Sequence, residues 1–251
     1  MTQAASTLLV TGASRGIGAA TALLAAQRGW NVAVNYTSNA AAAEDVAAQV
    51  RALGRLAITA QADVADETAV RAMFARIDAE MPPLGGLVNN AGIVGMKARL
   101  DEMESARWRR LLDVNVFGSL LCAQLALLRM STRHGGQGGA IVNLSSMAAT
   151  LGSPAMYVDY AATKGAIDSF TIGLARELAG EGIRVNAIRP GIIDTDIHTA
   201  SGEPDRAQTA AGMIPMKRAG TASEVAHAIV WLLSDEASYT TGTIFDVSGG
   251  R

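Results

Sequence analysis

The chain has 251 residues, a formal net charge of −2 and 49% hydrophobic residues. This length allows one domain with a large core, and the lack of a basic excess argues against a nucleic-acid partner. The single cysteine, Cys122, cannot form an internal disulfide, and its apolar neighbours predict a small core residue. We see no signal peptide and no apolar run long enough to cross a bilayer. We therefore expect a cytoplasmic protein without a membrane partner.

Short apolar runs alternate with longer segments of helical period along the whole chain. Strands are predicted at 7–10, 31–36, 56–60, 87–89, 140–144, 183–188 and 244–247. Helices are predicted at 16–28, 40–53, 67–80, from about 106, at 158–179 and at 222–234. This alternation is typical of a parallel sheet with helices on both faces and right-handed crossovers. We predict a single α/β domain over 1–251, a doubly wound Rossmann-type fold with seven parallel strands.

A glycine-rich turn, TGASRGIG at 11–18, follows the first predicted strand. Gly12 permits a sharp turn, Gly16 lets the backbone approach a pyrophosphate, and Gly18 allows close packing of helix on sheet. The helix that starts here presents unpaired N–H groups and a positive dipole end to phosphates. Such a turn alone is weak evidence, but its place between the first strand and the first helix of a doubly wound pattern indicates a dinucleotide site.

The end of the second strand bears on the choice between NAD and NADP. NAD-binding folds usually carry an acid there, which holds the ribose 2′-hydroxyl. Here the strand ends as Asn35-Tyr36-Thr37-Ser38, so no carboxylate would repel a 2′-phosphate. Arg15 can reach this region and pair with phosphate, and the hydroxyls of Thr37 and Ser38 could add hydrogen bonds. We expect a preference for NADP(H); the alternative is that Arg15 is solvated and Tyr36 simply stacks near the adenine.

Three further motifs follow the later strands. Asn-Asn-Ala-Gly at 89–92 comes after the fourth strand, Asn-Leu-Ser-Ser at 143–146 ends the fifth, and Tyr160 and Lys164 lie on the next helix. A Tyr and a Lys four residues apart share one helix face. That pair alone is common on protein surfaces. Its position after the glycine turn and the Asn-Asn-Ala-Gly segment makes chance a poor explanation.

With these motifs the chain resembles the short-chain dehydrogenase/reductase family over essentially all of 11–250. It is most similar to the branch that holds 3-oxoacyl-acyl-carrier-protein reductases and bacterial glucose dehydrogenase-like enzymes. The resemblance implies a catalytic tetrad of Asn115, Ser146, Tyr160 and Lys164. It implies an oxidoreductase that interconverts a carbonyl and an alcohol by hydride transfer with NADP(H), for which we favour a ketone or 3-oxoacyl substrate. The alternatives are a sugar or polyol dehydrogenase and, more remotely, a non-catalytic NADP-binding sensor.

The tetrad implies a division of roles. Tyr160 gives a proton to the carbonyl oxygen as hydride arrives at the carbon, and takes it back in the reverse direction. The ordinary tyrosine pKa of about 10 is high for this role, so we expect Lys164 and the oxidised nicotinamide to lower the pKa of Tyr160. Ser146 binds the substrate oxygen, Lys164 also holds the nicotinamide ribose, and Asn115 holds a water that links Lys164 to solvent.

The resemblance also implies the cofactor contacts. Asp63 and Val64 match the family's adenine contacts. The segment PGIIDT at 190–195 matches its nicotinamide-carboxamide loop, with the Ile193 backbone and the Thr195 hydroxyl as the expected contacts. The full set of residues expected to bind the cofactor is Gly12, Ser14, Arg15, Gly16, Ile17, Gly18, Tyr36, Thr37, Ser38, Asp63, Val64, Asn90, Ala91, Gly92, Tyr160, Lys164, Pro190, Gly191, Ile193 and Thr195.

One departure from the family pattern lies between Ser146 and Tyr160, a stretch one residue longer than in many members. It leaves a second tyrosine, Tyr157, just upstream. The residue four positions after Tyr157 is Ala161 rather than a lysine, so we assign the proton transfer to Tyr160. Ser145 is the alternative to Ser146, which we favour.

Substrate specificity is expected in 92–99, 147–157 and 194–216, the last as a mobile lid or, alternatively, a plain surface loop. These segments mix apolar and small polar residues, and they contain no basic cluster that would indicate a phosphate group on the substrate. Their composition therefore does not identify the substrate. His134, His198 and His227 lack ligand partners at useful spacing, and we expect no metal site.

Small and apolar residues are frequent at 111–130, at 158–179 and at the end of the chain. Since family members usually form tetramers of two-fold symmetry through such elements, we expect a homotetramer. The alternative is that these stripes belong to the internal core.

Overall fold

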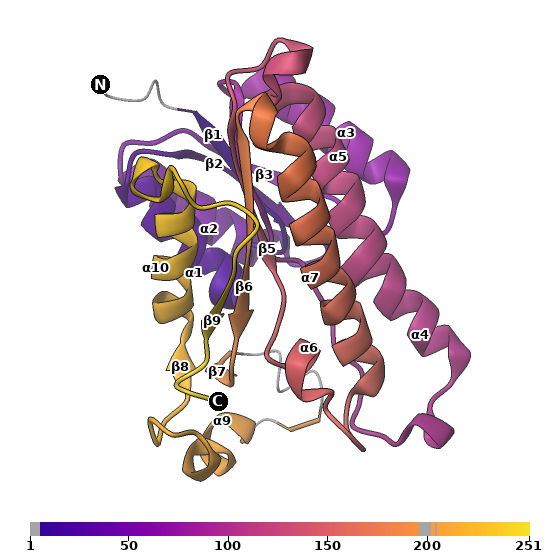
Figure 1. The fold of residues 1–251 in the computed structure, drawn as a ribbon. Coiled ribbons are helices and arrows are strands. Elements are labelled where there is room, and N and C mark those ends of the chain that lie inside the picture. The colour runs from indigo at the N-terminus through magenta and orange to yellow at the C-terminus, as the bar shows by residue number, and fades with distance from the viewer. Residues whose placement is uncertain (1–5, 196–201, 204) are drawn as a thin grey trace.

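The computed structural model describes residues 6–195, 202–203 and 205–251 (Figure 1). Seven parallel strands form one sheet. In their order across it, they are β3 (Ala57–Gln61), β2 (Asn31–Tyr36), β1 (Thr7–Val10), β4 (Leu84–Asn89), β5 (Gly139–Leu144), β6 (Ile183–Pro190) and β9 (Ile244–Val247). The order runs outward in both directions from β1 and β4, which is the doubly wound arrangement.

Helices cover both faces of the sheet (Figure 1). One face carries α1 (Gly16–Gln27), α2 (Ala40–Ala52) and α10 (Ala222–Leu233), whose apolar residues share one buried cluster with the strands. The other carries α3 (Glu67–Glu80), α5 (Gly118–Met130) and α7 (Val158–Leu178), which bury a second cluster. The predicted seven-stranded α/β fold is therefore confirmed. Because both faces are covered, β1 is buried at every residue and reads as a continuous apolar run.

Shorter elements complete the chain. α4 (Ser105–Leu112) leads into α5, α6 (Ala148–Leu151) precedes α7, and α9 (Arg206–Thr209) precedes α10. A second sheet pairs β7 (Ile193–Asp194) with β8 (Gly220–Thr221). Single helical turns lie at Leu100–Glu102, Thr132–His134, Ala179–Glu181, Ala211–Met213 and Asp235–Ala237.

The structure differs from the predicted elements in three places. β4 begins at Leu84 rather than at residue 87, since Gly85 and Gly86 interrupt the apolar pattern. The helix expected from about residue 106 contains a π-helical segment, Asp113–Phe117, between α4 and α5. The small β7–β8 sheet was not predicted, because two-residue strands carry no periodicity.

The helical run Ser105–Met130 is apolar. By length and composition alone it could cross a membrane, and it is the one such helix among the described residues. However, 56% of its most apolar stretch is buried inside the fold, where α5 packs on β4 and α3. Cys122 belongs to this run and is fully buried, and burial raises the pKa of its thiol to about 12. The apolar character of the run is thus that of a core helix, with Cys122 as the small core residue that we predicted.

A buried polar ladder joins the strands near their carboxyl ends. The Asn89 side-chain amide donates to the Asn143 side-chain oxygen at 2.9 Å, and the Asn143 amide donates to the Thr171 hydroxyl at 2.9 Å. Buried polar groups are costly unless they are paired. This ladder therefore fixes β4, β5 and α7 relative to one another just beneath the edge where the sequence motifs lie.

Candidate active site

A pocket opens at the carboxyl edge of the sheet. It is lined by Ile17 of the glycine turn, by Asn90 and Gly92, by the pair Ser145 and Ser146, by Tyr160 and Lys164, and by most of the 190–195 segment. These residues come from segments far apart in the sequence. The fold thus brings residues of the glycine turn, the serine pair, the Tyr–Lys pair and the 190–195 segment to one place, as expected for the carboxyl edge of an open parallel sheet.

The glycine turn adopts the backbone conformation that its residues were expected to permit. Gly12 and Gly16 have φ angles of +61° and +55°, in the left-handed region that favours glycine. A Cβ on Gly18 would lie 2.5 Å from the Gly12 carbonyl oxygen, so α1 packs against the turn without room for a side chain. The buried Asn35 accepts a hydrogen bond from the Gly12 N–H at 3.0 Å, which ties the turn to β2. The turn leaves an open backbone at the start of α1, which fits a pyrophosphate.

Asn90 ties the glycine turn to the segment that follows β4. Its side-chain amide donates to the carbonyl oxygens of Thr11 and Gly12 at 2.8 and 3.0 Å. In return the Thr11 hydroxyl accepts from the backbone N–H groups of Asn90 and Ala91, both at 2.9 Å. Thr11 was not among the predicted site residues, although it directly precedes the first glycine. Its role is to hold the two cofactor-facing loops together.

Tyr160 and Lys164 lie on successive turns at the start of α7. The Lys164 Nζ atom lies 5.6 Å from the centre of the Tyr160 ring and donates to the Leu144 carbonyl oxygen at 2.6 Å. Ser146 hydrogen-bonds Tyr160, whereas the Ser145 hydroxyl donates to the Lys164 carbonyl oxygen at 3.2 Å. Of the two serines, Ser146 is thus the one in contact with Tyr160, and Ser145 anchors the α7 backbone.

The pKa values differ from the sequence-based expectation. Burial raises the pKa of Tyr160, and the hydrogen bond with Ser146 opposes that rise only in part. Burial also lowers the pKa of Lys164 to about 8, with the negative charge of Asp168 opposing it. We expected Lys164 to lower the pKa of Tyr160. Both groups are desolvated, however, and desolvation favours the neutral form of each.

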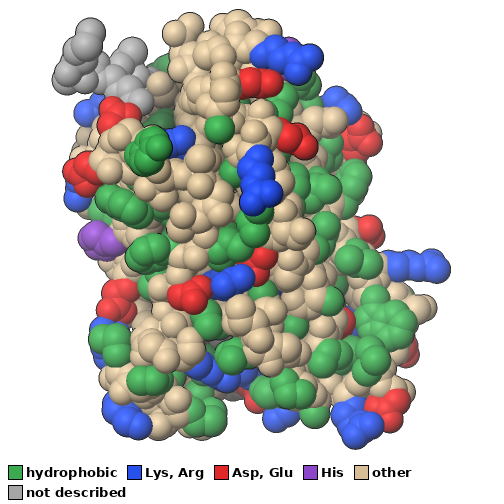
Figure 2. All heavy atoms as spheres, viewed as in Figure 1, with side chains coloured by type: hydrophobic (Ala, Val, Ile, Leu, Met, Phe, Trp, Pro, Cys, Tyr) green, Lys and Arg blue, Asp and Glu red, His purple; other side chains and the backbone are tan. Residues whose placement is uncertain are grey.

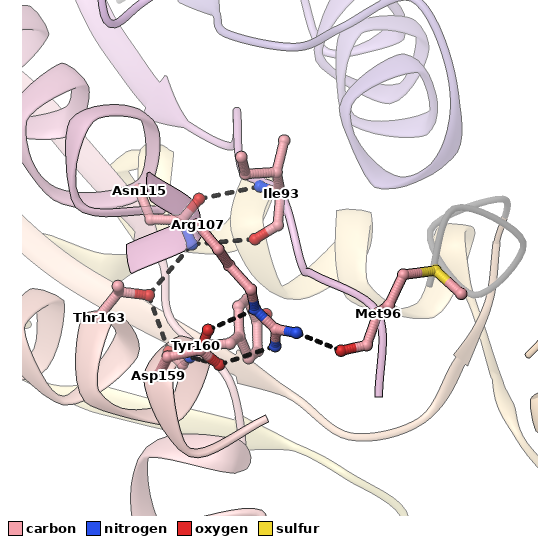
Figure 3. Close-up of polar contacts among 7 residues, drawn as sticks. All are labelled: Ile93, Met96, Arg107, Asn115, Asp159, Tyr160 and Thr163. Atoms are coloured by element: carbon pink, nitrogen blue, oxygen red, sulfur yellow. Dashed lines mark hydrogen bonds and ion pairs between the residues drawn. The ribbon is translucent and has the colours of Figure 1, made fainter. Parts of the chain in front are cut away.

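Asn115 lies in the π-helical segment, a feature that often marks functional sites. Its side-chain oxygen accepts from the Ile93 N–H at 2.8 Å, and its amide donates to the Ile93 carbonyl at 3.0 Å and to the Thr163 hydroxyl at 3.1 Å (Figure 3). A Cβ on Gly92 would lie 3.4 Å from the Asn115 oxygen and 3.5 Å from Lys164 Nζ. Asn115 and Lys164 therefore both adjoin Gly92, and Asn115 also holds the Ile93 backbone through two hydrogen bonds.

The expected adenine and ribose contacts are not among the residues that line this pocket. The Asp63 carboxylate accepts from the Ala65 N–H at 3.0 Å and from Arg110 at 2.6 Å. Burial raises the pKa of Asp63, but these two hydrogen bonds and the Arg110 charge lower it by more. The Val64 side chain is buried against Gly118, so only its backbone can meet a ligand. Tyr36 is half-buried, and Arg15, Thr37 and Ser38 are exposed.

The 190–195 segment leaves the end of β6 and folds toward the glycine turn. The Pro190 carbonyl accepts from the Met147 N–H at 3.0 Å, and the Gly191 N–H donates to Val247 at 2.9 Å. A Cβ on Gly16 would lie 3.5 Å from the Thr195 side chain. The segment therefore lines the pocket and passes close to the start of α1.

A largely buried ion pair that the sequence analysis missed supports the turn that carries Tyr160. Arg107 of α4 forms two hydrogen bonds with Asp159, at 2.6 and 3.0 Å, and their side chains are only 18% and 6% exposed. Arg107 also donates to the Met96 carbonyl oxygen, and Asp159 accepts from the Tyr160 N–H at 2.9 Å (Figure 3). The pair thus links the 92–99 segment to the residue that carries the phenol. The two residues are 52 positions apart, so no local pattern reveals them.

Tyr157 also forms polar contacts, with residues of the 194–216 segment. Its hydroxyl donates to Glu203 at 2.5 Å, and Arg206 pairs with the same carboxylate. Tyr157 and Arg206 line the pocket. Arg206 belongs to the 194–216 segment, in which we recognised no functional charge from the sequence. Residues 196–201 and 204 of that segment lie outside the described residues, and so does His198.

Metal ligation was not expected from the sequence. Within the described ranges, no group of three or more His, Cys, Asp or Glu side chains could hold a metal ion. His134 and His227 are exposed, and His227 Nδ1 is hydrogen-bonded to the Ser223 carbonyl oxygen.

The Arg107–Asp159 pair leads to a stability prediction. The change Arg107→Met leaves a buried carboxylate without its cation, so we expect the free energy of unfolding to fall by about 3 kcal/mol. Adding Asp159→Asn removes the stranded charge and should restore most of the loss, as measured by urea unfolding. The control is Arg99→Met, which breaks an exposed pair with Asp101 and should cost less than about 1 kcal/mol. Equal effects of the two arginine variants would contradict the assigned role.

Comparisons with known proteins show the family to which the chain belongs. A family model described as enoyl-(acyl carrier protein) reductase matches residues 12–251. The uncharacterized oxidoreductase YgfF of Escherichia coli is 54% identical over 97% of this chain and 98% of its own. The 3-oxoacyl-acyl-carrier-protein reductase FabG of Staphylococcus aureus is 40% identical over 96% of each chain. Glucose 1-dehydrogenase 2 of Bacillus subtilis is 38% identical over 97% of this chain and 93% of its own. The chain therefore belongs to the short-chain dehydrogenase/reductase family and is an NAD(P)-dependent oxidoreductase.

Proposed function

We propose that this protein is an NADP(H)-dependent reductase of ketones or 3-oxoacyl compounds, with Tyr160 as its general acid and base. The observation that carries the proposal is the convergence of Tyr160, Ser146 and Lys164 on a pocket that also reaches Ile17 at the start of α1. A proton donor, an oxygen-binding hydroxyl and a cation thus face the space beside the dinucleotide turn. A carbonyl that enters this space meets all three groups.

The chain's own residues account for the proton chemistry. The nicotinamide supplies or accepts the hydride. The Ser146 hydroxyl and the Tyr160 hydroxyl both donate to the carbonyl oxygen, which binds the substrate and stabilises the charge that develops on it. Tyr160 then transfers its proton to that oxygen. Because burial raises its pKa, Tyr160 is protonated near neutral pH and is ready for the reductive direction.

Lys164 supports this step from the next turn of α7. Its pKa of about 8 leaves it mostly protonated at neutral pH. Its ammonium then stabilises the phenolate that proton transfer leaves on Tyr160. Asn115 holds the Ile93 N–H, which keeps the preceding residue, Gly92, beside Lys164. We propose that Tyr160 is reprotonated from solvent through Lys164 and a water held near Asn115.

The choice between substrates rests on the relatives. One relative is a 3-oxoacyl-acyl-carrier-protein reductase and another a glucose dehydrogenase, so a sugar or polyol dehydrogenase is the second candidate. The discriminating experiment measures NADPH oxidation with ketones, acetoacetyl thioesters and quinones, and NADP⁺ reduction with glucose and polyols. We expect the highest kcat/KM for a ketone or a thioester. Turnover of glucose or polyols alone would favour the second candidate. If none of these compounds is turned over, a non-catalytic sensor is favoured.

Tyr160 is tested directly by substitution with phenylalanine. The change Tyr160→Phe removes the transferred proton, so we expect kcat to fall roughly 100- to 10,000-fold. NADPH binding, measured by fluorescence titration, should remain nearly intact. The comparison variant is Tyr157→Phe, which loses only the hydroxyl bonded to Glu203 and should keep measurable turnover. Full activity in Tyr160→Phe would refute the assignment.

The preference for NADP(H) is supported by the exposed Arg15, Thr37 and Ser38 and by the lack of an acid at the end of β2. We expect Arg15→Ala to raise the KM for NADPH by roughly tenfold or more, since it removes a charge-assisted hydrogen bond. The KM for NADH should not change. The control is Arg28→Ala, at the opposite end of α1. Equal or better use of NADH by the unaltered protein would contradict the preference.

We also propose a homotetramer in the cytoplasm. Exposed apolar side chains lie along the α4–α5 run, where Leu112, Phe117, Leu120 and Leu128 are 38–50% exposed. Hydrophobic side chains gather over α4 at the lower right of Figure 2. Such a surface fits burial against a second copy. Light scattering should give the mass of four chains, and Leu120→Glu should lower it. The mass of a single 25.9 kDa chain would contradict the proposal.

A further inference from the structure

One wall of the pocket carries an arginine that the proton chemistry does not use. Arg206, the first residue of α9, lines the pocket together with Tyr157, Ser153 and Leu151. Its side chain is only 17% exposed. A guanidinium stays charged throughout the physiological pH range. The pocket therefore receives a permanent positive charge on the side of Tyr157.

The charged side chains that line the pocket are of one sign. Lys164, Arg206 and Arg251 line it, and none of its described lining residues is an aspartate or a glutamate. Lys164 is already engaged beside Tyr160. A partly desolvated pocket strengthens the attraction of a cation for an anion, because water screens it less. The lining thus favours a ligand that carries negative charge.

Glu203 neutralises this wall only in part. It accepts hydrogen bonds from Arg206 and from the Tyr157 hydroxyl, and Lys97 Nζ lies 3.8 Å from its carboxylate. Two cations therefore share one carboxylate, which leaves a net positive charge. Burial raises the pKa of Glu203, but its hydrogen bonds and the nearby cations lower it by more, so it stays ionised.

Only one nitrogen of the Arg206 guanidinium donates hydrogen bonds to residues that the structure describes. The hydrogen bonds that it forms with described residues, to Glu203 and to Tyr157, all use Nη1. A guanidinium has five N–H donors in a planar fork that matches a carboxylate. Its Cζ atom lies 5.3 Å from the centre of the Tyr157 ring, a contact that holds the group beside the aromatic face. The guanidinium is thus held beside Tyr157, and its Nε and Nη2 donors have no hydrogen bond to any residue that the structure describes.

We propose that Arg206 binds a carboxylate on the substrate, so that the preferred substrates are keto acids and the corresponding hydroxy acids rather than neutral ketones. This assignment rests on the proposed function, since it names the substrate class of the same pocket. Tyr157 is the residue before α7 and Tyr160 lies three positions later, roughly one helical turn away, and both line the pocket. The carboxylate is therefore a short spacer away from the reacting carbonyl.

The alternative is a purely structural role, in which Arg206 only holds Glu203 and Tyr157 in place. A structural role would affect charged and neutral substrates alike, because a distorted pocket does not distinguish them. Anion binding predicts a selective effect instead. The ratio of kcat/KM for a keto acid to that for its methyl ester isolates this effect, since losses common to both cancel.

The experiment measures that ratio with NADPH for 3-oxobutanoate, 4-oxopentanoate and 5-oxohexanoate, each against its methyl ester. We expect the unaltered protein to prefer the acid for at least one chain length. Arg206→Gln should lower that ratio about tenfold or more. Glu203→Gln should raise it, because it removes the carboxylate that competes for Arg206. The control is Arg71→Gln, which breaks an exposed ion pair on α3 and should leave the ratio unchanged.

Three outcomes are decisive. If the ratio is the same in the unaltered protein and in both variants, the anion site is wrong, while turnover of the esters leaves the proposed function in place. If no acid, ester or ketone supports NADPH oxidation, the proposed function itself is wrong. If Arg206→Gln raises only the KM for NADPH, the arginine binds the cofactor and the substrate assignment is overturned.

Discussion

The hydrogen bonds between Thr11 and Asn90 are the interaction on which the rest of the site depends. They join the ends of β1 and β4, the two neighbouring strands from which the sheet is wound in opposite directions. Asn90 also bonds the Gly12 carbonyl. Gly12 therefore keeps its left-handed turn, and Gly92 lies under Lys164. The cofactor side and the proton-transfer side of the pocket are thus fixed relative to each other by one pair of polar side chains.

Much of this could be predicted from the sequence, because it depends on local pattern. Alternating strand and helix periods predict the parallel sheet, and backbone freedom at Gly12 and Gly16 predicts the turn. The helix repeat predicts that Tyr160 and Lys164 share a face. The long-range pairs could not be predicted. Arg107 meets Asp159 across 52 residues and Tyr157 meets Glu203 across 46, and nothing in the intervening sequence marks either contact.

The pKa values of Tyr160 and Lys164 could not be predicted from the sequence. A Tyr–Lys spacing says that a cation is near a phenol, which by itself predicts a lower tyrosine pKa. Burial is set by the whole fold, and here it lowers the Lys164 pKa and raises that of Tyr160. At neutral pH Tyr160 is therefore protonated, and the pKa of Lys164, about 8, lies only slightly above the pH. Asp168, one turn further along α7, opposes the lowering of the Lys164 pKa.

In the function that we propose, proton transfer and substrate choice both depend on the first turn of α7. Asp159 anchors the Tyr160 backbone to Arg107, and through it to the Met96 carbonyl in the 92–99 segment. Tyr157, at the helix start, contacts Arg206 on the pocket wall. A shift of this turn would move the proton donor and both of these contacts together. On the proposed assignment, a substrate held by Arg206 would be positioned by the same helix turn that carries Tyr160, so that binding at a distance would align the carbonyl with the phenol.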